Sequence, residues 1–138
     1  MDRIPDDFRD LIDGPVVVLL TTLMPDGQPQ TTPVWCDAEG DLIRINTMSC
    51  FRKARNMRLN PKVTLLAYQP ERTGRFLEVR GEVVEMTEDG ALAHLDGLSM
   101  LYTGRAPYFG EIIPAHYAET EIPVLVRIKP LRVIANDF

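Results

Sequence analysis

The stretch that decides the fold is NTMSCFRKARNMRLNP, residues 46–61. It predicts a short helix entered from a strand, with Phe51, Ala54 and Met57 spaced as an apolar stripe. A helix N-terminus carries about half a positive charge and therefore favours acids. Here no acid occurs anywhere in residues 42–70, although the whole chain has a net charge of -5. The helix carries bases instead, at Arg52, Lys53, Arg55 and Arg58.

Two explanations for these bases are open. One is a solvated helix face, since amphipathic helices carry bases routinely. The other is a bound anion, which the free N–H groups, the helix dipole and two adjacent bases would all favour. Arg52 and Lys53 together offer a forked donor and a point charge, which suits a phosphate group. Just before them, Asn46, Thr47 and Ser49 can donate hydrogen bonds to the same ligand.

Outward from this segment, the sequence predicts strands joined by short turns. The β-branched run at residues 16–23 predicts a strand buried on both faces. Short connections favour antiparallel neighbours, and six such strands would close as a small barrel without exposed edges. We therefore expect a mainly β protein, a six-stranded antiparallel barrel with inserted helices, in one domain over residues 1–138. The expected strands are residues 16–23, 29–37, 42–47, 62–68, 75–86 and 124–135.

Several local features refine this prediction. Pro29 and Pro33 lie inside the second strand, so this strand is either an edge or is bulged where something approaches its backbone. Gly81, in the middle of the fifth strand, predicts a bulge or a sharp bend. Helices are expected at residues 4–14 and 87–104. The second helix should have its N-cap at Thr87, its C-cap at Gly104, and an apolar stripe made of Leu92, Leu95, Leu98 and Leu101 or Tyr102.

Composition limits the classes of function. The chain has 138 residues, of which 45% are hydrophobic and 25% charged, as in a single globular domain. A pI near 5.0 argues against general nucleic-acid binding, which needs a basic face. We find no signal-peptide pattern and no membrane-spanning apolar run. Cys36 and Cys50 do not form a zinc or disulfide motif. We expect a cytoplasmic protein with two reduced, buried cysteines and no metal.

Other candidate residues carry weaker patterns. His94, in the leucine-rich helix, is expected to be packed or partly exposed, and His116 could reach a ligand across a dimer. The aromatic side chains of residues 102–109 could cover a flat ring, or could simply hold an irregular loop on the barrel. The sequence contains no Ser-His-Asp spacing, no HExxH motif and no P-loop, so it does not support a hydrolase or a nucleoside triphosphatase.

The order of elements and several motifs resemble the flavin-binding split-barrel superfamily, which includes pyridoxamine 5′-phosphate oxidase. The similarity is greatest to the short branch that uses the deazaflavin coenzyme F420. It covers about the whole chain, and the pair Arg52–Lys53 followed by NPKV is its most specific part. The motifs are TTLMPDGQPQTTPVW at 21–35, INTMSCFRKARNMRLNPKVTLL at 45–66, VRGEVVEM at 79–86, LYTG at 101–104 and VLVRIKPLRV at 124–133.

The resemblance implies a homodimer with two cofactor sites at the subunit interface. Arg52 and Lys53 would hold the cofactor phosphate, while Asn46 and Thr47 would line the chain that leads to the ring. The proline-containing strand would lie beside the ring system through Thr32, Pro33, Val34 and Trp35. For Trp35, an ordinary core or interface role is the equal alternative.

The sequence departs from the oxidases of this superfamily at three places. Phe51 replaces the serine that usually precedes the Arg–Lys pair, and Phe76 lies near the place of a strand glutamine. The sequence also ends at IANDF, without the arginine-containing substrate segment of true pyridoxamine phosphate oxidases. These departures weaken the case for that specific activity and for FMN.

The activity implied by the resemblance is hydride transfer from bound F420 or FMN to a small planar conjugated substrate. F420 has an acidic oligoglutamate tail, for which Arg55, Arg58 and Lys62 would extend the positive strip beyond the phosphate. The alternatives are an FMN-binding protein related to pyridoxamine 5′-phosphate oxidase, or a non-catalytic flavin or deazaflavin carrier.

Overall fold

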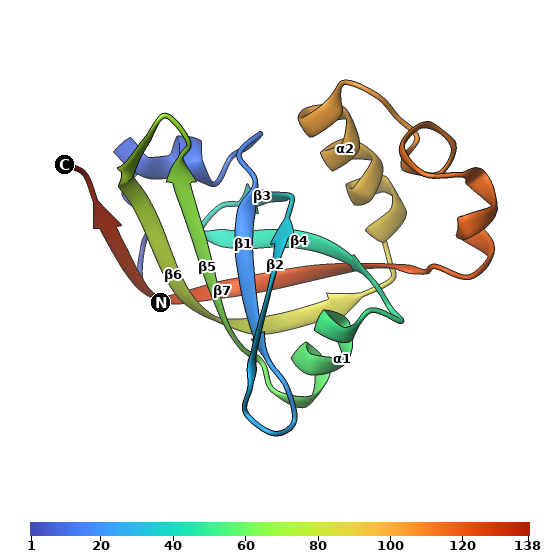
Figure 1. The fold of residues 1–138 in the computed structure, drawn as a ribbon, viewed down its shortest axis with the longest axis horizontal. Coiled ribbons are helices and arrows are strands. Elements are labelled where there is room, and N and C mark those ends of the chain that lie inside the picture. The colour runs from blue at the N-terminus through green and yellow to red at the C-terminus, as the bar shows by residue number, and fades with distance from the viewer.

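Seven strands form one antiparallel sheet in the order β2-β1-β5-β6-β7-β4-β3. The computed structural model describes all of residues 1–138. The sheet curls strongly around its core, with α2 at one end of the molecule and both termini at the other (Figure 1). The strands are β1 (Val18–Leu23), β2 (Pro29–Val34), β3 (Cys36–Glu39), β4 (Leu42–Met48), β5 (Lys62–Gln69), β6 (Arg72–Thr87) and β7 (Pro123–Asn136).

The two edge strands, β2 and β3, are consecutive in the chain and are separated only by Trp35. The prediction of a single strand at 29–37, and hence of six strands, is therefore wrong. The chain changes partners at this point: Val34 of β2 pairs with β1, whereas Cys36 of β3 pairs with β4. The mainly β, antiparallel character is confirmed. The prediction of a barrel without exposed edges is wrong, because the curled sheet stays open and ends in the two edge strands β2 and β3. The edge explanation for the prolines also holds, because β2 pairs only with β1 and in an unbroken register.

Each strand turns one face toward the core. In β1 buried and half-buried residues alternate, so the prediction of burial on both faces is wrong. An antiparallel sheet that packs on one side produces this alternation. The core residues Ile45 of β4, Leu65 of β5, Val79 of β6 and Val126 of β7 are fully buried.

Gly81 lies where β6 bends. The register between β6 and β7 shifts between Arg80 and Gly81, as the sequence predicted. A Cβ atom at Gly81 would lie 2.6 Å from Cγ2 of Ile128 and 3.1 Å from the carbonyl oxygen of Lys129. The strands therefore approach each other too closely here for a larger residue.

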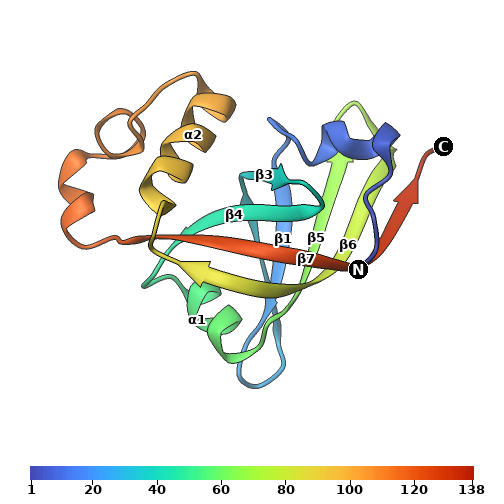
Figure 2. The same cartoon turned by 180° about the vertical axis from the view of Figure 1, so that it is seen from behind.

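Helices cover the ends of the sheet. The 3₁₀ helix η1 (Asp6–Leu11) packs against β5 and β6 through buried apolar residues. Helix α1 (Arg52–Leu59) follows β4, and α2 (Ala91–Thr103) packs against β4 and β7, as Figure 2 shows from behind. Two short helical turns, η2 (Tyr108–Ile112) and η3 (Ala115–Glu119), lead into β7. None of the helices combines the length and the hydropathy that a membrane span requires.

Helix α2 differs from its prediction in two ways. Its N-cap is Gly90 and not Thr87, because Thr87 ends β6 and its hydroxyl accepts a hydrogen bond from the amide of Asp89 (3.1 Å). Leu92 and Leu101 are exposed, so the buried side of the helix comprises Ala91, His94, Leu95, Leu98 and Ser99. The C-cap at Gly104 is confirmed by its positive φ of 74°.

The cysteines are both free, as expected. Cys36 is buried, and its burial raises the pKa of the thiol to about 12. Cys50 is exposed, so the prediction that it is buried is wrong. It lies in the turn between β4 and α1, outside the packed sheet.

Candidate functional site

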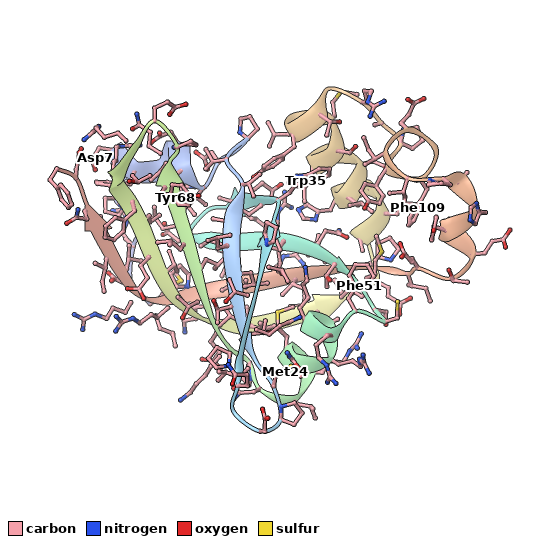
Figure 3. The ribbon with its side chains drawn as sticks, in the orientation of Figure 1. Asp7, Met24, Trp35, Phe51, Tyr68 and Phe109 are labelled. Atoms are coloured by element: carbon pink, nitrogen blue, oxygen red, sulfur yellow. The ribbon has the colours of Figure 1, made fainter.

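A cleft of about 400 Å³ lies where the end of β4, the start of α1, helix α2 and the β2–β3 junction meet. Its size is in the range of small-molecule sites. Eight of its 12 lining residues are hydrophobic, and the polar residues among them come from β4 and α1. In Figure 3, Trp35 lies between β2 and α2, and Phe51 lies near the start of α1.

The cleft brings together many of the residues predicted from the sequence. Thr32, Ser49 and Arg52 do not line it. Ser49 is engaged by Arg58, whose guanidinium donates to the Ser49 carbonyl (3.0 Å) and hydroxyl (2.9 Å). Arg52 is half-buried at the first position of α1. The predicted residues that do line the cleft are Pro33, Val34, Trp35, Asn46, Thr47 and Lys53.

Lys53 is the positive charge of the cleft. It is partly buried, and this burial lowers the pKa of its ammonium group from the ordinary value of 10.5. No carboxylate lies within ion-pair distance of Lys53, Arg52 or Arg55. The N-cap residue Phe51 provides no side-chain acceptor to the first turn, which contains no acid. An anion at this helix start would be favoured by both the charges and the dipole.

Four buried side-chain atoms in the structure have no hydrogen-bond partner. Three of them belong to predicted site residues: Thr32 Oγ1, Asn46 Oδ1 and Thr47 Oγ1. The fourth is Oδ1 of Asn56. Leaving a buried polar group unpaired costs about 1–3 kcal/mol. Asn46 and Thr47 line the cleft, so a polar ligand that hydrogen-bonds to their unpaired oxygens would remove part of that cost.

An aromatic cluster forms one wall of the cleft. The ring of Trp35 stacks on Tyr102, with centroids 5.3 Å apart, and meets the edge of Tyr108 at 6.1 Å. The Tyr102 hydroxyl donates to the carbonyl of Val16 (2.7 Å) and accepts from the amide of Cys36 (3.0 Å). Trp35 therefore both lines the cleft and helps to hold α2 on the sheet.

Behind Asn46 lies a polar network that the sequence did not indicate. Nδ2 of Asn46 donates to the carbonyl oxygen of Ala91 (2.8 Å) and lies 3.2 Å from Nδ1 of His94. Nε2 of His94 lies 3.1 Å from Oδ1 of Asp37, which Arg44 holds through two bonds of 2.9 and 2.7 Å. His94 is 8% exposed, so its predicted packing is confirmed.

Sequence reasoning missed other parts of the lining. Val17, Met48, Leu95 and Leu98 line the cleft as ordinary apolar residues, and no motif distinguishes them. Tyr108 is the residue of the aromatic segment that reaches the cleft, whereas Phe109 packs against Tyr108 (5.3 Å between centroids). His116 is exposed and stacks on Tyr117, away from the lining.

Comparison with known proteins places this geometry in a family. The sequence profile described as pyridoxamine 5′-phosphate oxidase matches residues 4–134. A solved structure described as an F420 reductase is 28% identical, with a TM-score of 0.81, over 95% of this chain and 98% of the other. A conserved hypothetical protein from Mycobacterium tuberculosis is 25% identical (TM-score 0.74; 99% and 90% covered). The HupZ protein of Group A Streptococcus, at 19% identity and a TM-score of 0.68 (98% and 99% covered), shares the fold. No protein with a curated description matches the sequence.

Proposed function

The chain belongs to the pyridoxamine 5′-phosphate oxidase family, and on that premise we propose that it is an oxidoreductase that binds F420, with FMN as the alternative cofactor. The cofactor would lie in the cleft between β4, α1 and α2. When bound, it supplies hydride-transfer chemistry toward a small planar conjugated substrate. The similarity to an F420 reductase along almost the whole chain supports the choice of a deazaflavin.

The observation that carries this proposal is the uncompensated charge of Lys53. A partly buried ammonium group without an acidic partner is unfavourable, and its lowered pKa reflects this. A cofactor phosphate would supply the missing negative charge. Arg52, at the preceding position, would hold the same phosphate, since a charge-assisted hydrogen bond contributes about 1.5–3 kcal/mol.

The rest of the cleft fits the neutral parts of such a cofactor. Pro33, Val34 and Trp35 offer an apolar surface for a flat ring and exclude water from it. The unpartnered oxygens of Asn46 and Thr47 can hydrogen-bond to the polar chain or to the ring edge. These residues bind and orient the cofactor, and none of them needs to act as a general base.

The strip of bases beyond the phosphate favours F420 over FMN. Arg55 and Lys62 are exposed and make no ion pair, so they are free to attract an acidic tail. Arg58 is instead held by Ser49 and is less suited to that role. Exposed charges contribute up to about 1 kcal/mol each, so this preference is a modest one.

We also propose that the protein acts as a homodimer in which the partner completes the site. Val17 and Phe51 line the cleft, yet 48% and 40% of their surfaces are exposed. A second subunit that covers these apolar side chains would deepen the cleft around a bound ring.

The experiment that tests the activity is a hydride-transfer assay with reduced F420 and a panel of enones, quinones and tetrapyrroles. We expect oxidation of reduced F420 that depends on both the protein and one class of acceptor. If the cofactor binds but no acceptor is reduced, the activity is rejected in favour of a carrier. Turnover with FMN alone would instead support the FMN-binding alternative.

A further inference from the structure

The polar network behind the cleft fixes the orientation of one side-chain amide. Nitrogen and oxygen of an asparagine are usually assigned from their partners. Here the assignment follows from Ala91, because its carbonyl oxygen can only accept and therefore requires Nδ2 of Asn46 at 2.8 Å. The same Nδ2 lies 3.2 Å from Nδ1 of His94. Both hydrogens of the amide are thus used on α2.

The asparagine in turn determines the histidine tautomer. Since Asn46 donates to Nδ1 of His94, this nitrogen must accept, and the ring proton lies on Nε2. Nε2 then donates to Oδ1 of Asp37. Burial alone raises the pKa of Asp37, but the hydrogen bonds from His94 and Arg44 outweigh burial and lower it. Asp37 is therefore a carboxylate and a suitable acceptor for His94.

The amide oxygen of Asn46, Oδ1, is the one polar atom of this side chain that is not yet hydrogen-bonded. It is buried, and Asn46 lines the cleft. An amide oxygen can only accept, so it cannot bind phosphate and requires an N–H or O–H donor. We propose that His94, held by Asp37, is a positioning residue that keeps Asn46 Oδ1 as an acceptor for a neutral donor group of the bound cofactor. This inference rests on the proposed function.

Flavins and deazaflavins share two groups with this chemistry: the imide N–H of the ring and the hydroxyls of the ribityl chain. Two analogues separate them. In one analogue of the tighter-binding cofactor, F420 or FMN, the imide nitrogen is methylated, and in the other the chain is an alkyl linker without hydroxyl groups. Binding is measured by fluorescence titration without substrate, so the result does not depend on turnover.

We expect the wild-type protein to bind one of the two analogues about five- to tenfold more weakly than the parent cofactor, as for the loss of one neutral hydrogen bond. In Asn46→Leu this discrimination should fall below about twofold. In His94→Phe it should fall in the same way although Asn46 is present, because the amide is no longer held. His94→Gln should restore it, since glutamine can accept from Asn46 and donate to Asp37.

A purely structural role for His94 predicts a different pattern, in which His94→Phe weakens all three ligands equally. That result would overturn the inference, as would equal binding of all three ligands by the wild type. Ser99→Ala is the control, since Ser99 is buried in α2 but donates to the carbonyl of Arg105.

The ¹⁵N spectrum of His94 is an independent test on the unliganded protein: we expect a neutral ring protonated at Nε2, and protonation at Nδ1 contradicts the inference. If neither cofactor binds, the proposed function fails and this inference fails with it.

Discussion

At the scale of single residues, the site is defined by polar and charged groups that the protein itself leaves unpaired. Lys53 has no acidic partner within ion-pair distance, and Asn46 and Thr47 each have a buried oxygen without a hydrogen-bond partner. Residues of this kind reduce stability and are common at functional sites. Their coincidence in one cleft makes ligand binding the simplest explanation for the bases of α1, in preference to a solvated helix face.

The first prediction concerns Arg52 and Lys53, the pair proposed to bind the cofactor phosphate. Replacing Arg52 and Lys53 by alanine should weaken cofactor binding by several kcal/mol, at about 1.5–3 kcal/mol for each charge-assisted bond. Fluorescence titration measures the change in Kd. Arg132→Ala removes one exposed positive charge from β7, outside the cleft, and should change Kd little. Unchanged affinity in the double variant would mean that the phosphate binds elsewhere.

The second prediction concerns pH. Burial lowers the pKa of Lys53, so in the free protein this group loses its charge at a lower pH than an ordinary lysine. An anionic cofactor prefers the charged form, so affinity should fall as pH rises through the lowered pKa. In Lys53→Arg the guanidinium stays charged, and the alkaline loss should disappear. A wild-type Kd that stays constant up to the ordinary lysine pKa would contradict this assignment.

The Arg52–Lys53 pair and His94 show what the sequence could and could not predict at this scale. The Arg–Lys pair and its preceding strand were predictable, because adjacent bases at a helix start are a local pattern. The contacts of His94 with Asn46 and Asp37 join residues 48 and 57 positions apart. No local spacing marks such a pair, so it becomes visible only in three dimensions.

At the scale of elements, the β2–β3 junction is the feature that places Trp35 and the proposed ring-binding surface in the cleft. The chain leaves one edge of the sheet at Val34 and joins the other at Cys36. Trp35, between them, is free of ladder pairing and lines the cleft. The sequence predicted one strand here, and its two prolines indicated an edge strand or a bulge. The exchange of partners at Trp35 depends on the curl of the whole sheet and could not be predicted locally.

The third prediction concerns the bend of β6. Gly81→Ala places a methyl group 2.6 Å from Ile128 Cγ2, so neighbouring strands must shift. We expect a loss of about 1–3 kcal/mol in the free energy of unfolding, measured by denaturant titration. Gly97→Ala is the matched control: apart from its chain neighbours and the local backbone of α2, no atom lies within 4 Å of the added methyl. That change should stabilise the protein by about 0.5–1 kcal/mol. Equal effects of the two substitutions would contradict this account of Gly81.

At the scale of the whole molecule, the antiparallel sheet was predictable because short turns and β-branched runs are local signals, whereas its open edges at β2 and β3 were not. The position of α2 was harder to predict from the sequence, since the start and the buried face of this helix follow from its packing on β4 and β7. Leu92 and Leu101, expected in the core, are exposed because His94 and Ser99 occupy the buried side. Tertiary packing decided which face of that helix is inside.

The fourth prediction concerns assembly. We expect a dimer in light scattering at micromolar protein concentration, with Val17 and Phe51 covered by the partner. Val17→Glu should shift the population toward monomer and weaken cofactor binding together. Leu131→Glu alters another exposed apolar residue, on β7 and outside the cleft, and should do neither. A monomer that binds the cofactor with full affinity would show that the cleft of one subunit is sufficient.

Cofactor binding in the cleft is tested most directly by titration of the wild-type protein with F420 and with FMN, followed by fluorescence. We expect saturable binding of one molecule per chain, with F420 bound at micromolar Kd or tighter and FMN more weakly. If neither cofactor binds more tightly than a Kd of about 1 mM, which corresponds to a binding free energy of about 4 kcal/mol, the proposed cofactor site is contradicted.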